Sequence, residues 1–310
     1  MTAADPGTQF RSGFVTLVGR PNVGKSTLVN QIVGSKVAIV SDRPQTTRTQ
    51  IRGVRTTATS QIVLLDTPGI HKPRTLLGER TNQRAIATLN EVDLIALLIE
   101  ADAPIGRGDR FIAEMVQQAG TPMLLVLNKV DRASNQQVLA HLADATSALG
   151  DFDAYVPLSA KTGKGVDGLI GEIESRLDLG PRYYPDGTVT DQPETTLAAE
   201  LVREQLLAMA RDELPHSISV QVAEIEPDAD RAAPDPDAPP ILRLRAVILV
   251  ERESQKGIVI GKGGAVLKAA GTAARLELEA LLGVRVYLET NVKVERDWQR
   301  RAGALDRLGF

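Results

Sequence analysis

A glycine-rich loop near the start of the chain carries residue types that bind phosphate. The stretch matches the pattern G-x-x-x-x-G-K-S and reads Gly19-Arg20-Pro21-Asn22-Val23-Gly24-Lys25-Ser26-Thr27. Its glycines allow turns in which successive N–H groups point at phosphate oxygens, at the start of a helix. The loop predicts a site where Lys25 reaches the β- and γ-phosphates and Ser26 coordinates Mg²⁺. A chance glycine loop is the alternative, which the expected strand–loop–helix context disfavours.

Two later segments can complete a magnesium and γ-phosphate site. Asp66-Thr67-Pro68-Gly69 ends an apolar run, so Asp66 can bind Mg²⁺ and the Gly69 N–H can reach the γ-phosphate. Alone this tetrapeptide is equally typical of a turn. Between it and the glycine loop stand Thr46 and Thr47, of which we favour Thr47 as a further Mg²⁺ ligand when the γ-phosphate is bound. That segment would then be a switch.

A guanine reader is predicted after the apolar run 123–127, at Asn128-Lys129-Val130-Asp131. Asp131 can accept hydrogen bonds from guanine N1–H and the exocyclic amine. Adenine lacks this donor pair and would leave the carboxylate unpaired, so its rejection is strong. Asn128 can hold the base edge near N7, and the stem of Lys129 can lie over the ring.

A last short motif, Ser159-Ala160-Lys161, follows the apolar run 154–157. The backbone N–H of Ala160 can serve guanine O6. The bare tripeptide carries no information, but here it comes fifth in an ordered series of nucleotide motifs. The five motifs together predict guanine-nucleotide binding, with GTP or GDP and Mg²⁺ as ligands.

A second glycine loop, Gly261-Lys262-Gly263-Gly264, precedes the expected helix 265–282. A G-x-x-G loop of this kind resembles that of KH domains, where it lets a nucleic-acid backbone approach closely. Lys262 would supply charge to phosphate, and Lys268 lies on the helix that follows. A simple helix-entry turn is the commoner explanation of a lone G-x-x-G.

The elements that must position these motifs form two groups. The chain has 310 residues, enough for about two domains, and is 43% hydrophobic. Strands are expected at 14–18, 51–57, 61–65, 94–100, 123–127 and 154–157, and helices at 25–33, 78–90, 107–118, 135–148 and 166–176. This alternation predicts an α/β domain over 13–177, with a mostly parallel sheet and helices on both faces.

The remainder predicts a second, α+β domain. Residues 1–12 read as a flexible N-terminus without a secretory signal, and 178–196 as a proline-containing linker. Residues 197–310 give the order α-β-β-α-α-β and a terminal helix from about Asp297. Within them, the Pro- and Asp-rich stretch 226–240 predicts a disordered insertion.

Composition limits the classes of function. The chain has no cysteine, which excludes disulfides and cysteine-ligated metals. Its net charge of -3 provides no global attraction for polyanions, but residues 255–310 carry ten Lys or Arg against six acids. No apolar run is long enough to span a bilayer.

The five nucleotide motifs resemble those of translation-factor-like GTPases of the P-loop class. Two details refine what the resemblance implies. Asn22 implies a K⁺ ion near the phosphates in place of an arginine finger. Ile70 stands where signalling GTPases have a water-positioning glutamine, which implies that backbone groups and the cation orient the water. Slow turnover, faster in K⁺ than in Na⁺, is expected.

The two halves together resemble the bacterial Era family, which has a C-terminal type II KH domain. The resemblance implies binding to the 3′ end of small-subunit (16S) ribosomal RNA and to the 30S particle. It further implies a GTP-timed checkpoint in subunit assembly by a cytoplasmic monomer, with peripheral association at the inner membrane face. The alternatives are a GTPase whose C-terminal domain binds protein or lipid, and a non-catalytic RNA-binding module. The insertion 226–240 is longer and more acidic than this family leads us to expect.

Overall fold

The computed structural model describes residues 9–41, 48, 51–70, 72–209, 217–228 and 240–310. Thr46 and Thr47 of the expected switch lie outside the described residues, as do 1–8 and 229–239. The chain divides into two compact units, here described separately. The first comprises residues up to Ala38, Thr47–Arg74 and Gly78–Asp191, and the second comprises Ile39–Thr46, Thr75–Leu77 and Gln192–Phe310. Ile39 and Leu77 are buried in clusters of the second unit, which explains its two short additions.

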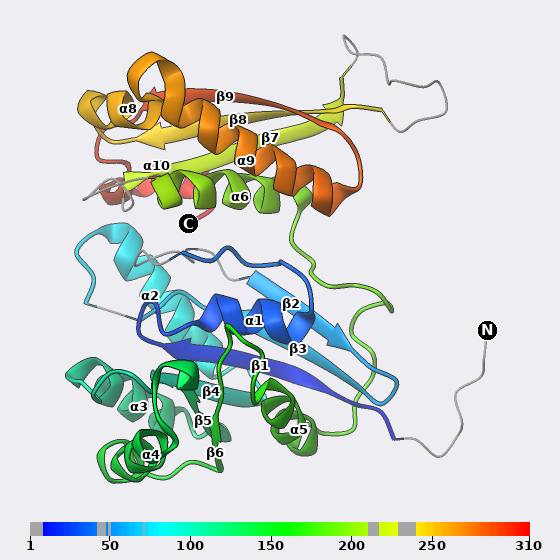
Figure 1. Ribbon diagram of the computed structural model, residues 1–310, viewed down its shortest axis with the longest axis vertical. Coiled ribbons are helices and arrows are strands. Elements are labelled where there is room, and N and C mark those ends of the chain that lie inside the picture. The colour runs from blue at the N-terminus through cyan, green and yellow to red at the C-terminus, as the bar shows by residue number, and fades with distance from the viewer. Residues whose placement is uncertain (1–8, 42–47, 49–50, 71, 210–216, 229–239) are drawn as a thin grey trace. The chain divides into compact units, whose positions relative to one another are not determined.

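The first unit is built on a six-stranded sheet with the order β2-β3-β1-β4-β5-β6 (Figure 1). All neighbouring strands are parallel except the antiparallel pair β2–β3. The elements are β1 (Arg11–Gly19), α1 (Lys25–Val33), β2 (Ile51–Thr56), β3 (Ser60–Asp66), α2 (Leu76–Leu89), β4 (Leu94–Glu100), α3 (Arg107–Ala119), β5 (Met123–Asn128), α4 (Asn135–Leu149), β6 (Ala154–Pro157) and α5 (Val166–Arg176). The predicted α/β class with a mostly parallel sheet is confirmed.

Helices cover both faces of this sheet because its central strands are apolar on both sides. In β4, Leu94, Ala96 and Leu98 join the core with α1 and α5. The alternating residues of the same strand, Ile95 and Leu97 among them, join the core with α2, α3 and α4. Because β1, β3, β4 and β5 are parallel, their carboxyl ends meet at one edge of the sheet, where the nucleotide motifs begin.

Residues 178–191, here called the covering segment, run along the first unit. The Val54 N–H donates to Val189 O (2.9 Å), and Arg52 pairs with Asp191 (2.8 Å). The fully buried side chain of Gln61 accepts from Tyr183 N (2.7 Å) and donates to Tyr184 O (2.9 Å). Most of the expected linker 178–196 is thus bonded to the first unit. The sequence did not predict this attachment, because side-chain hydrogen bonds leave no hydrophobic periodicity.

The second unit has a three-stranded sheet with the order β7-β8-β9, in which β7–β8 is antiparallel and β8–β9 parallel. Its elements are α6 (Glu194–Met209), β7 (Ser219–Pro227), β8 (Leu242–Val250), α8 (Glu253–Ile260), α9 (Ala265–Leu282), β9 (Val286–Val294) and α10 (Ala302–Arg307). The core lies between this sheet and α6 and α9. The order α-β-β-α-α-β agrees with the predicted α+β second domain.

Two details of the second unit differ from expectation. Strand β7 continues to Pro227, and the Asp228 N–H donates to Ile241 O (2.7 Å), so residues 226–228 of the expected insertion 226–240 are ordered. The terminal helix does not start at Asp297, whose φ of 51° is left-handed and stops a helix from propagating. A single 3₁₀ turn, Trp298–Arg300, precedes α10 instead, and Trp298 is fully buried. Among the described residues, no helix combines the length and apolarity needed to cross a membrane.

Candidate functional site

The phosphate loop runs from the end of β1 to the start of α1, as predicted. Gly19 (φ 152°) and Gly24 (φ 101°) adopt left-handed backbone conformations that favour glycine. A Cβ on Gly19 would lie 2.6 Å from Leu98 O, and one on Gly24 would collide with Asn128 Nδ2. Both glycines are thus required by space as well as by backbone. Asn22 is one of three described non-glycine residues with positive φ (66°).

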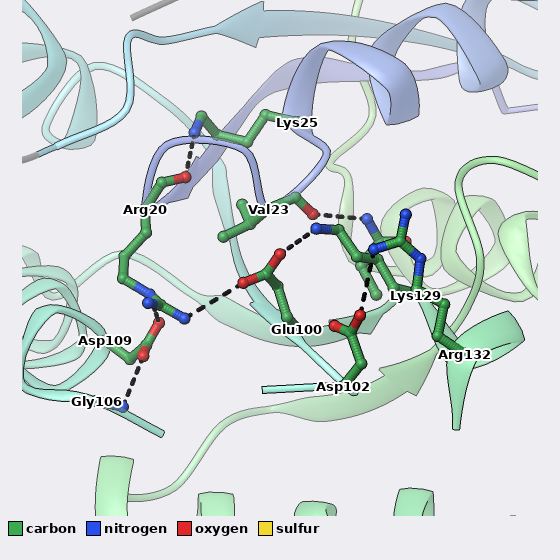
Figure 2. A network of polar contacts seen from close by, with 10 residues as sticks. Arg20, Val23, Lys25, Glu100, Asp102, Gly106, Asp109, Lys129 and Arg132 are labelled. Atoms are coloured by element: carbon green, nitrogen blue, oxygen red, sulfur yellow. Dashed lines mark hydrogen bonds and ion pairs between the residues drawn. The ribbon is translucent and has the colours of Figure 1, made fainter. Parts of the chain in front are cut away.

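Lys25 is folded back over the loop. Its Nζ donates to Arg20 O (3.0 Å; Figure 2) and to Gly19 O (3.1 Å), and its side chain is buried. Burial lowers the pKa of Lys25 to about 8, although the nearby charge of Asp66 opposes the shift. A buried cation with this pKa gains from an added anion, so the arrangement suits a phosphate.

The two expected magnesium ligands of the described chain lie together. Ser26 Oγ donates to Asp66 Oδ2 (2.8 Å), and Asp66 is fully buried at the end of β3. Thr67 Oγ1 donates to Leu17 O (2.9 Å) and fixes the chain beyond β3 onto β1. A hydroxyl and a carboxylate are hard oxygen donors, so this pair fits Mg²⁺.

The segment after Asp66 lies directly against the phosphate loop. Pro68 is buried, and a Cβ on Gly69 would lie 2.8 Å from Pro21 N and 2.9 Å from its Cα. Ile70 is 4% exposed and belongs to the core with α2, α3 and α4. Its side chain therefore packs in this core, and the orientation of water by backbone groups and the cation stays a prediction.

Asn128 joins three loops. Its Nδ2 donates to Val23 O (2.7 Å) in the phosphate loop, and its Oδ1 accepts from Ala160 N (2.9 Å). The side chain is 2% exposed. The Ala160 N–H, which is expected to serve guanine O6, is here bonded to Asn128. A bound base must therefore share this donor or take it over.

The carboxylate of Asp131 is kept in its ionised form by its neighbours. Ser159 Oγ donates to Asp131 Oδ1 (2.6 Å), and this hydrogen bond is the main reason that the pKa of Asp131 is lowered. The charges of Arg132 and Lys161 act in the same direction. The carboxylate thus stays ionised, the form that can accept two hydrogen bonds from guanine.

Lys129 is connected to two residues that the sequence motifs did not predict, Glu100 and Asp109. Its Nζ pairs with Glu100 at the end of β4, and Glu100 also lies 3.5 Å from the guanidinium of Arg20 (Figure 2). Arg20 Nε donates to Asp109 Oδ1 (2.8 Å) on α3. Glu100 and Asp109 belong to no motif. The only signal in the sequence is that Glu100 is an acidic residue at the end of an apolar strand. That strand ends at the same sheet edge as the strand before the glycine loop.

The second glycine loop connects α8 to α9 in the other unit. Gly261 (φ 73°), Gly263 (φ 59°) and Gly264 (φ 80°) are all left-handed. An added Cβ on Gly261 would lie 2.9 Å from Val266 N, whereas Gly263 and Gly264 face open space. Lys262 and Lys268 are exposed. The loop thus offers open backbone and positive charge, as binding to a nucleic-acid backbone requires.

Comparison with protein families divides the chain in the same way. Residues 14–129 match the family described as 50S ribosome-binding GTPase, and residues 213–299 match the KH domain family.

Individual proteins match over almost the whole chain. GTPase Era of Mycobacterium sp. (strain JLS) and that of Mycolicibacterium paratuberculosis (strain ATCC BAA-968 / K-10) are each 50% identical over 305 residues, 98% of this chain and all of each relative. A crystal structure of an Aquifex aeolicus Era variant bound to GDP·AlF4⁻ is 37% identical with a TM-score of 0.91. One of Era with MgGDPNP and nucleotides 1506–1542 of 16S ribosomal RNA is 37% identical with a TM-score of 0.92. Each covers 97% of this chain and 99% of the other. The chain therefore belongs to the Era family of GTPases.

Proposed function

We propose that this protein hydrolyses GTP to GDP and phosphate, binds the 3′ end of 16S ribosomal RNA through its KH domain, and times a step of small-subunit assembly. The observation that carries the proposal is the meeting of the phosphate loop, the Ser26–Asp66 pair and the Asn128–Asp131 reader at one sheet edge. It is supported by the similarity, over 97% of the chain, to an Era structure that holds both MgGDPNP and 16S ribosomal RNA.

In the hydrolytic site, the backbone N–H groups of residues 22–27 would cradle the phosphates, with Lys25 at the β- and γ-phosphates. Ser26 and Asp66 would hold Mg²⁺, joined by Thr47, and the metal would neutralise charge on the phosphates. The Gly69 N–H would donate to the γ-phosphate. Because the side chain of Ile70 is buried, backbone groups would orient the attacking water.

Phosphate release from GTP, measured with the purified protein, tests the enzymatic part. Lys25→Ala should abolish release at saturating GTP, because the developing charge loses its main cation. Unchanged release from this variant would contradict an active site at the phosphate loop.

A K⁺ ion beside the phosphates would be held in part by Asn22, the non-glycine residue of the loop with a left-handed backbone. Turnover should be faster in K⁺ than in Na⁺ at equal ionic strength. Asn22→Ala should remove the difference while leaving turnover in Na⁺ almost unchanged. Equal turnover of the wild type in the two salts would refute the assignment of Asn22.

RNA binding would use the loop Gly261–Gly264 with Lys262 and Lys268. Lys262→Glu should weaken binding of an RNA that corresponds to the 16S 3′ end by about tenfold, because a phosphate contact becomes repulsive. Arg285→Glu is the matched control. Arg285 follows the C-terminal end of the 18-residue helix α9, about 27 Å along its axis from the loop. Equal losses in the two variants would indicate that only net charge matters.

In the timing step, bound GTP would favour RNA binding, and hydrolysis would release the particle. Reciprocity then requires that RNA favour the GTP-bound state by the same factor. RNA affinities measured with a GTP analogue and with GDP should differ. Identical affinities would reject the timing role and leave an RNA-binding GTPase.

The location and assembly state rest on the family resemblance: a cytoplasmic monomer that associates peripherally with the inner membrane face. Sedimentation velocity tests the monomer. Co-sedimentation with anionic lipid vesicles tests membrane association, and vesicle or protein binding without RNA binding would favour a GTPase with a different C-terminal partner.

A further inference from the structure

A row of four charged side chains crosses the nucleotide site of the first unit. It consists of Asp109, Arg20, Glu100 and Lys129, and we call it the charged bridge (Figure 2). Arg20 Nε donates to Asp109 Oδ1 (2.8 Å), and Arg20 Nη2 lies 3.5 Å from Glu100 Oε2. The other oxygen of Glu100 accepts from Lys129 Nζ. The bridge therefore alternates in sign and uses both oxygens of its central carboxylate.

The bridge is anchored at its far end. Asp109 is 2% exposed, and its second oxygen accepts from Gly106 N (2.8 Å) at the start of α3. A carboxylate in the first turn of a helix is stabilised by the helix dipole. Gly108 adds a steric limit, since a Cβ there would lie 2.9 Å from Arg20 Cδ. The guanidinium of Arg20 is thereby fixed on the side away from Glu100.

Glu100 lies where the two halves of the nucleotide site meet. It ends β4, which is paired with β1 on one side and with β5 on the other, and its register partner on β5 is Asn128. Arg20 is the second residue of the phosphate loop, and Lys129 is the residue whose stem is expected over the guanine ring. Glu100 is only 17% exposed, so its ion pairs are less screened than those at an open surface.

We propose that Glu100 is a positioning residue that holds Lys129 for the base and, through Arg20, couples the base reader to the phosphate loop. The inference rests on guanine-nucleotide binding at this site. It assigns the bridge to retention of the nucleotide and leaves the hydrolytic step to Lys25, Asp66 and Gly69, none of which belongs to the bridge.

Removing the charge of Glu100 leaves Arg20 and Lys129 on either side of an uncharged side chain. Lys129 then loses its anionic partner, and Arg20 keeps only Asp109. Loss of charge-assisted hydrogen bonds of this kind gives about a tenfold change in an equilibrium or rate constant. Glu100→Gln, which keeps the shape of the side chain, should release GDP about tenfold faster, raise the KM for GTP, and keep kcat within about twofold of the wild type.

The experiment measures release of a fluorescent GDP analogue from the full chain, chased with unlabelled GDP, for the wild type, Glu100→Gln, Arg20→Lys and the double variant. Arg20→Lys keeps the charge but lacks the fork that reaches Asp109 and Glu100 together. Asp102→Asn is the matched control, because the neighbouring Arg132–Asp102 pair (3.2 Å) lies outside the bridge. Thermal unfolding of the nucleotide-free proteins shows that each variant is folded.

Faster release from both single variants, with the double variant no faster than Glu100→Gln alone, is the expected result. If the increase in release rate of the double variant equalled the product of the two single increases, the proposed coupling would be overturned. Release within about twofold of the wild type in Glu100→Gln, or a parallel fall in kcat, would overturn the positioning role. A wild type that fails to bind the analogue would instead refute the proposed function.

Discussion

Asn128→Ala tests whether the hydrogen bonds of Asn128 between the base reader and the phosphate loop contribute to nucleotide binding. The substitution removes two hydrogen bonds to backbone groups, one to Val23 O (2.7 Å) and one from Ala160 N (2.9 Å). The wild-type side chain is 2% exposed, so water does not simply replace these bonds. Each buried group that loses its partner costs about 1–2 kcal/mol, and the pair about 2–4 kcal/mol.

We expect this loss to fall on binding, because the loops that Asn128 joins are those proposed to hold the nucleotide. A loss of about 2–4 kcal/mol raises the Kd for GDP by about thirtyfold to several hundredfold. Isothermal titration calorimetry with GDP measures the change. Loss of the expected contact to guanine N7 would add to it.

Gln61→Ala is the control for general destabilisation. Gln61 is also fully buried and is bonded to backbone groups of Tyr183 and Tyr184, but it stands near the opposite end of β3 from Asp66. It should lower the unfolding temperature and leave the Kd for GDP unchanged. If Asn128→Ala kept wild-type affinity, or if Gln61→Ala lost affinity equally, a specific tie through Asn128 would be refuted.

Three further predictions concern neighbouring residues. Ser159→Ala removes the donor to Asp131 (2.6 Å), so the pKa of Asp131 should rise toward its ordinary value, seen by NMR titration of the carboxyl carbon; an unchanged pKa would contradict this cause. The pKa of Lys25 is about 8 in the folded protein and about 10.5 unfolded, so the charged form destabilises the fold. The free energy of unfolding of the nucleotide-free protein, measured with denaturant, should therefore rise between about pH 8 and 10 relative to that of Lys25→Met. The same pH dependence in both proteins would refute this. Gly69→Ala places a Cβ 2.8 Å from Pro21 N, so kcat should fall at least about tenfold, measured by phosphate release, and a wild-type kcat would exclude close packing of this segment during turnover.

Sequence patterns predicted most of the fold because the first unit uses strong signals. The apolar run of β4 is buried on both faces, and glycines or polar clusters flank most helices, so the expected bounds fall within a few residues of those observed. The covering segment was not predictable in this way. Its attachment depends on side-chain hydrogen bonds such as those of Gln61, which leave no periodic pattern.

The site residues likewise divide into those that sequence motifs predict and those that depend on the folded structure. Ordered motifs predicted Lys25, Ser26, Asp66, Asn128 and Asp131, since each expected chemistry requires a residue type at a fixed spacing, and the structure places these motifs at one sheet edge. Glu100 and Asp109 were missed because their roles arise from strand register and from the first turn of α3, not from spacing along the chain. The hydrogen bond from Ala160 N to Asn128 is likewise a property of packing between loops.

The covering segment has a consequence for how the chain can be divided. Strand β2 lies at the border of the six-stranded sheet, and unpaired backbone groups on such a strand attract strands of other molecules. A chain shortened to end at 177 would uncover β2 and leave the amide of Gln61 without its partners at Tyr183 and Tyr184. A chain that ends at 191 keeps both protected. The smallest soluble nucleotide-binding piece is therefore set by protection against aggregation rather than by the last nucleotide motif.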